Sequence, residues 1–133
     1  MIRRTRPGAG RPERDKSAAA AAAEHMIITP DMVRYMAQNN YLSYCSYVNR
    51  GRWRPSNHLS VICGHLDLLV EGRIRNLIII TPPRHGKSMT VTEGFPSYCI
   101  GRNPDSRVIE ISYGDDLAKI FGEKNRQKME EYG

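Results

Sequence analysis

The sequence predicts an α/β fold that begins a parallel sheet flanked by helices. Residues 77–80 are four consecutive aliphatic side chains, a pattern typical of a central parallel strand buried on both faces. The motif Gly86-Lys87-Ser88 follows closely and precedes a helix-forming stretch. Residues 107–112 read as a second strand before another helix. The order strand, loop, helix, strand, helix is that of a doubly wound sheet, here incomplete.

The composition divides the 133 residues into a tail, residues 1–25, and a domain, residues 26–133. Residues 1–16 carry six basic and two acidic side chains, a net charge of +4, whereas the whole chain carries +6. Six alanines follow in residues 18–23. Such a segment buries too little apolar surface to offset its ordering entropy, so we expect it to be disordered. Electrostatic contact with nucleic acid is the alternative interpretation.

Two helices are expected ahead of the first strand. Thr29 is placed to cap a helix that starts at Pro30 and ends near residues 39–40. Residues 41–48 are aromatic and ambiguous. Ser56 or Asn57 would cap the next helix, which Gly72 is placed to end. Its apolar residues recur every three or four positions, the stripe of a packed helix: Leu59, Ile62, Cys63, Leu66, Leu69 and Val70.

Two further helices are expected after the first strand. Residues 87–100 should be helical, although Pro96 must kink or shorten that helix. Residues 101–105 read as a turn. A last helix should start at Asp115 or Asp116 and run to about Glu131.

The Gly86-Lys87-Ser88 motif has the context of a phosphate-binding loop of the Walker A type. Backbone N–H groups at a helix start have no intrahelical partners and attract anions. Gly86 would let the backbone approach a phosphate, and Lys87 would reach the β- and γ-phosphates. The Ser88 hydroxyl would bind Mg²⁺. The predicted cofactors are therefore ATP and Mg²⁺, held by residues 84–89: Arg84, His85, Gly86, Lys87, Ser88 and Met89.

The loop departs from the usual pattern, because Thr81 stands where the first glycine is expected. Arg84 would contact the γ-phosphate as an arginine finger does, and it is the one candidate catalytic residue. A surface arginine paired with a carboxylate is the alternative. His85 is interpreted as a residue that shapes the turn. An ordinary strand-turn-helix with a solvated lysine is the simpler interpretation of the whole motif.

The stretch "PPRHGKS", residues 82–88, resembles the large subunit of bacteriophage terminases, the ATPase that drives DNA into the capsid. The segment "NHLSVICGHLDLLVEGRIRNLIII" before it and "FPSYCIGRNPDSRVIEISYGDDLA" after it look similar to that family as well. The resemblance covers residues 53–129. It implies an additional-strand ATPase domain related to helicases and recombinases (RecA-like), followed in the family by a nuclease domain.

The resemblance also implies roles and partners. Lys87 and Ser88 match the phosphate and Mg²⁺ positions. His58 lies where the family contacts adenine, with a helix-capping or surface histidine as the alternative. Trp53 would stack on adenine or DNA, or anchor the core or a loop. The implied partners are double-stranded viral DNA, a portal protein and a small terminase subunit, with a homo-oligomeric ring in the cytoplasm of a bacterial host.

Hydrolysis needs an acidic residue at the end of another strand, and the sequence offers none. Asp115 and Asp116 read as a helix start, and Glu110 as a strand residue. We therefore expect a fragment that binds ATP weakly without useful ATPase or nuclease activity, and that exposes an apolar sheet edge. The alternatives are another P-loop ATPase of the helicase or recombination type, and an inactive prophage remnant acting as a binding module.

The three cysteines, Cys45, Cys63 and Cys99, have no metal-binding spacing and suit a reducing compartment. No run of the sequence approaches the 18 apolar residues of a membrane span. The arginine-rich start lacks the apolar region of a signal peptide. These features predict a cytoplasmic protein with no membrane contact.

Overall fold

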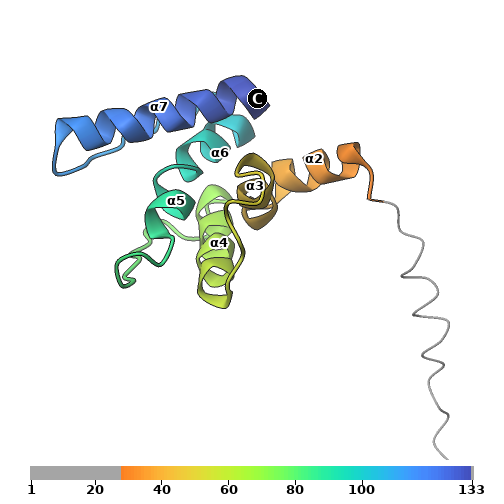
Figure 1. Ribbon diagram of the computed structural model, residues 1–133, viewed down its shortest axis with the longest axis horizontal. Helices are drawn as coiled ribbons and strands as arrows, with labels where there is room; N and C mark the ends of the chain where they lie inside the picture. The colour runs from red at the N-terminus through yellow and green to blue at the C-terminus, as the bar shows by residue number, and fades with distance from the viewer. Residues whose placement is uncertain (1–27, 133) are drawn as a thin grey trace, which may run out of the picture.

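The computed structural model describes residues 28–132, so the expected tail, residues 1–25, lies outside the described part of the chain. The regular elements of that part are helices (Figure 1). Their bounds are α2, Pro30–Asn39; α3, Tyr41–Val48; α4, Asn57–Val70; α5, Lys87–Val91; α6, Phe95–Arg102; and α7, Asp115–Tyr132.

The predicted parallel sheet is wrong, because residues 28–132 contain no β-strand. Residues 77–80 run into the loop without a neighbouring strand to share a hydrogen-bond ladder. Leu77 and Ile79 are half-buried against the core, whereas Ile78 and Ile80 are 85% and 90% exposed. One face of this aliphatic run therefore packs against the core, and the other face is exposed to solvent. Its composition had predicted that both faces would be buried.

The second predicted strand, residues 107–112, is also irregular. Ile109 and Ile111 are 84% and 92% exposed, while Glu110 between them is half-buried. The side chains alternate as in a strand, but the described residues supply no partner strand. The expected P-loop sheet of the RecA type is therefore corrected to a helical fold with two irregular apolar segments.

Several predicted helices are confirmed. α2 starts at Pro30, and the Thr29 side chain accepts a hydrogen bond from the Met32 backbone N–H at 3.3 Å. α4 begins after Ser56, although the Ser56 side chain makes no capping bond there. α7 starts at Asp115 as expected. The ambiguous residues 41–48 form helix α3, capped by Asn40, whose side chain accepts from the Ser43 N–H.

The helix expected over residues 87–100 is divided into α5 and α6. Gly94 is the N-cap of α6, and Pro96 lies in its first turn, where the missing N–H costs nothing. The proline therefore starts a new helix instead of kinking a continuous one. The backbone N–H groups of Thr92 and Glu93 both donate to the Ser88 carbonyl and close α5.

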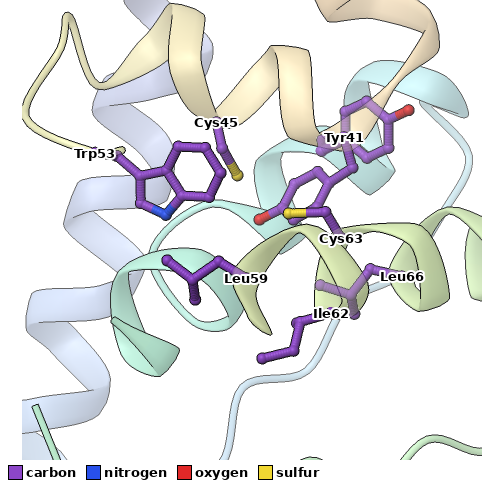
Figure 2. Close-up of a cluster of buried hydrophobic side chains, with 8 residues drawn as sticks. Tyr41, Cys45, Trp53, Leu59, Ile62, Cys63 and Leu66 are labelled. Atoms are coloured by element: carbon purple, nitrogen blue, oxygen red, sulfur yellow. The ribbon is translucent and has the colours of Figure 1, made fainter. Parts of the chain in front are cut away.

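The core lies where α3 and α4 meet the loop after α3 and helix α6 (Figure 2). Two polar contacts join α5 to this core: the Trp53 Nε1–H donates to the Thr90 Oγ1 at 2.8 Å, and the Tyr41 hydroxyl donates to the Thr90 carbonyl. These two bonds attach helix α5, which follows the loop of residues 81–86, to the core. The buried cluster consists of Tyr41, Cys45, Trp53, Leu59, Ile62, Cys63, Leu66 and Tyr98.

Helix α7 lies across α6 (Figure 1) and is joined to it through Asn125. The Asn125 side chain accepts from the Ser97 N–H at 3.2 Å and donates to the Thr92 carbonyl at 2.8 Å. A buried amide satisfied on both sides fixes the position of α7. Across residues 28–132, no helix combines the length and apolar character needed to cross a membrane.

Candidate phosphate-binding loop

Two residues with positive φ turn the loop between residue 81 and helix α5. Arg84 has a φ of 64° and Gly86 a φ of 78°. The left-handed region is costly for residues with a Cβ and free for glycine. Arg84 therefore holds a strained conformation on an exposed loop, and Gly86 forms the left-handed N-cap of α5.

Gly86 also lies directly over the core residue Leu59. A Cβ at this position would approach the Leu59 Cδ1 to 3.2 Å, a tight contact. The backbone conformation and the close approach therefore both favour glycine. The helix stripe of α4 indicated that Leu59 is buried, but nothing in the sequence pattern pairs it with Gly86.

Two histidines connect the loop to α4. The His58 Nε2 lies 3.0 Å from the His85 carbonyl oxygen, and the His85 Nδ1 lies 2.9 Å from the Pro83 carbonyl oxygen. Carbonyls only accept, so each of these ring nitrogens carries a proton and donates. The two rings lie edge to face, 5.8 Å apart. His85 thus shapes the turn, and His58 holds the turn from the start of α4.

The loop curves around an open hollow of about 460 Å³ whose wall is a single continuous segment, residues 81–89. Arg84, Lys87 and Ser88 line it and are exposed. No carboxylate belongs to the wall, so its net charge is positive. The Thr81 Oγ1 lies buried without a hydrogen-bond partner among the described residues. The hollow therefore offers two cations and a hydroxyl to an incoming group, and its rim includes an unsatisfied polar atom.

The structure brings most of the sequence-predicted site residues together. The six loop residues from Arg84 to Met89 all line the hollow. His58 contacts the loop through the His85 carbonyl. Trp53 is only 4% exposed and donates its Nε1–H inward to Thr90, so its ring face is not available to a base. Thr90, fully buried beneath the loop, is a support that the sequence analysis did not identify.

Acidic residues lie elsewhere. Asp115 and Asp116 occupy the first turn of α7, where the helix dipole favours them. Glu110 is half-buried beside Asn125, and burial raises the pKa of its carboxyl. Within residues 28–132 no three His, Cys, Asp or Glu side chains are grouped for a metal ion. Mg²⁺ at Ser88 would therefore depend on phosphate oxygens and water for its other ligands.

Comparisons with known proteins find a weak sequence similarity and no family. No protein-family profile matches the chain, and no solved structure matches it. The chain is similar to the human "Bromodomain adjacent to zinc finger domain protein 2A", with 26% identity over 134 residues. That alignment covers 96% of this chain and only 6% of the human protein. The likeness is too low to show a family.

These findings contradict the expected membership in the terminase large-subunit family. The described residues are helical without the sheet that the family implies, and the similar protein that was found carries a different name. The resemblance around residues 82–88 is therefore wrong as an identification. The predicted partners were viral DNA, a portal protein and a small terminase subunit. They rested on this resemblance alone, and the structure does not test them.

Proposed function

We propose that residues 81–89 bind the phosphate groups of a nucleotide such as ATP. The observation that carries the proposal is the hollow of about 460 Å³ lined by Arg84, Lys87 and Ser88 without any carboxylate. Guanidinium and ammonium groups form charge-assisted hydrogen bonds with phosphate oxygens. A hydroxyl beside them can donate to the same oxygens or hold a Mg²⁺ that arrives with them.

The support beneath the loop adds to the proposal. Leu59 under Gly86, and His58 at the His85 carbonyl, hold the backbone from the α4 side. Trp53 and Tyr41 hold Thr90 in α5. A loop fixed in this way loses little conformational entropy when it binds a ligand. Arg84 holds a positive φ on this loop, and strained backbone conformations of this kind cluster at functional sites.

The proposed activity is binding. The described residues place no carboxylate in the hollow to activate water, so we assign no hydrolytic step to the loop. An ordinary turn with solvated cations is the alternative, and it predicts no saturable affinity for nucleotides.

Calorimetry with ATP and Mg²⁺ tests the proposal on the full chain and on Lys87→Ala. A charge-assisted hydrogen bond is worth about 1.5–3 kcal/mol, so the variant should bind roughly ten- to a hundredfold more weakly. Lys119→Ala is the matched control, because Lys119 is an exposed lysine of α7 outside the hollow. Tripolyphosphate should compete with ATP. Absence of binding by the folded chain, or equal losses in both variants, would contradict the proposal.

A further inference from the structure

A second hollow, unrelated to the Gly86 loop, lies among α2, α3, α6 and α7. Its volume is about 330 Å³, at the small end of the range for ligand pockets. Figure 1 shows α6 between α7 on one side and α2 and α3 on the other, and α6 contacts all three. Nothing in the sequence pattern predicts it, because its wall is assembled from residues almost a hundred positions apart.

Aromatic rings form much of the wall. Tyr44, Tyr47, Tyr98 and Tyr132 all line the hollow. The rings of Tyr47 and Tyr132 lie 5.2 Å apart at 66°, and those of Tyr44 and Tyr98 lie 5.2 Å apart at 49°. The Tyr44 hydroxyl is already bonded to the Ser97 Oγ at 2.8 Å. Tyr98 is only 3% exposed and backs the wall, whereas the half-buried rings of Tyr44, Tyr47 and Tyr132 can offer apolar surface to a flat aromatic ligand.

Three cations and no carboxylate line the same hollow. The cations are Arg34, Arg102 and Lys128, and none of them forms an ion pair within residues 28–132. Arg102 donates to the Gln38 carbonyl and the Asn39 side chain, which fixes its guanidinium at the rim. The Lys128 ammonium is half-buried and donates to the Glu93 carbonyl.

Lys128 is half-buried, whereas Arg34 and Arg102 are exposed. Burial lowers the pKa of the Lys128 ammonium, because removal from water disfavours the charged form. The Glu93 carboxylate acts in the opposite direction and raises the pKa of Lys128. It is itself paired with the Lys124 ammonium at 2.8 Å. An anion in the hollow would lie beside three cations that form no ion pair within residues 28–132.

We propose that this hollow binds a small planar aromatic carboxylate of one or two rings. The rings of Tyr44, Tyr47 and Tyr132 hold the ring system, and the cations of Arg34, Arg102 and Lys128 attract the carboxylate. This site shares no residue with the loop of residues 81–89, so Lys87→Ala should leave binding at it unchanged.

The probe is 2-naphthoate, and 2-naphthamide is its uncharged match of the same shape. Calorimetry on the full chain should show saturable binding of the acid and at least tenfold weaker binding of the amide. Gly101→Leu should weaken binding, because Gly101 lines the hollow and a Cβ there meets no atom within 4 Å, which leaves room for a bulkier side chain at the wall. Arg34→Gln should weaken binding of the acid alone, and Arg52→Gln, an exposed arginine outside the hollow, should not.

Three outcomes would overturn the proposal. They are no binding of 2-naphthoate by the folded chain, equal affinity for the acid and the amide, and undiminished binding by a folded Gly101→Leu chain. If Gly101→Leu does not fold by circular dichroism, the Arg34→Gln result decides, and unchanged affinity for the acid there refutes the site.

Discussion

At the scale of single residues, Gly86 carries the tightest constraint in the loop. Its φ of 78° and the 3.2 Å approach to Leu59 both oppose a side chain. We expect Gly86→Ala to lower the free energy of unfolding by about 1–2 kcal/mol through the left-handed strain alone, and to weaken ATP binding. Urea titration followed by circular dichroism measures the first effect, and calorimetry the second.

Gly64 provides the matched control for that substitution. It lies exposed within α4 without a positive φ, and a Cβ there meets open space. Gly64→Ala should raise the free energy of unfolding by up to about 1 kcal/mol, since alanine is the better helix former. If the two substitutions changed stability in the same direction, the conformational argument for Gly86 would be refuted.

Asp67 is the acidic residue that connects α4 to α3 and α6. Its Oδ1 accepts from the Tyr41 N–H at 3.0 Å and from the Tyr98 hydroxyl at 3.1 Å. Burial raises the pKa of its carboxyl above the usual value, although these hydrogen bonds act in the opposite direction. The folded chain therefore retains this proton to higher pH than the unfolded chain does.

A raised pKa makes stability fall as the pH rises through the interval between the unfolded and folded pKa values. For Asp67 this interval begins at the ordinary carboxyl value, about pH 4. We expect the decline of the urea midpoint above that pH to become shallower in Asp67→Asn, and the part due to Glu110, whose pKa is also raised, to remain. Glu123→Gln, on the exposed face of α7, should keep the full decline. An unchanged profile in Asp67→Asn would refute this role.

At the scale of elements, the starts of α2, α4 and α7 could be predicted because the signals are local, whereas the break between α5 and α6 could not. The Thr29-Pro30 pair predicted the start of α2, and the structure confirms both the position and the capping bond. Ser56 was an equally reasonable cap by residue type, yet its side chain bonds to His58 instead of a helix N–H. Residue type fixes where a helix can start, whereas tertiary neighbours decide which hydrogen bond forms.

These two caps give a paired prediction. Thr29→Ala removes the bond to the Met32 N–H and should cost about 1 kcal/mol of stability. Ser56→Ala removes no capping bond and should change stability by less than about 0.5 kcal/mol. Guanidinium unfolding of both variants beside the parent chain distinguishes them. Equal losses would mean that the α2 cap contributes no more than the Ser56 side chain.

At the scale of the whole molecule, the fold class could not be predicted from local pattern. The composition of residues 77–80 and 107–112 is that of strands, but a sheet requires partner strands, and the described residues supply none. The loop residues 84–89 could be found because they are contiguous. The apolar stripe of α4 predicted that Leu59 is buried, but its place under Gly86, and the role of Thr90, come from tertiary packing that no local pattern shows.

The exposed side of residues 77–80 predicts association between copies of the chain. Ile78 and Ile80 are exposed, whereas Ile79 between them is half-buried against the core. Exposed aliphatic strand-like segments are prone to intermolecular association. Ile78→Thr with Ile80→Thr should therefore reduce concentration-dependent association, measured by light scattering after size-exclusion chromatography, and leave the urea midpoint almost unchanged.

Ile79→Thr is the contrasting substitution in the same segment. It places a hydroxyl against the core and should lower the free energy of unfolding by about 1–3 kcal/mol without reducing association. The contrast depends on which face of the segment the helices cover. Because neighbouring side chains of an extended segment point to opposite sides, a reversed result would mean that the covered face is the one bearing Ile78 and Ile80.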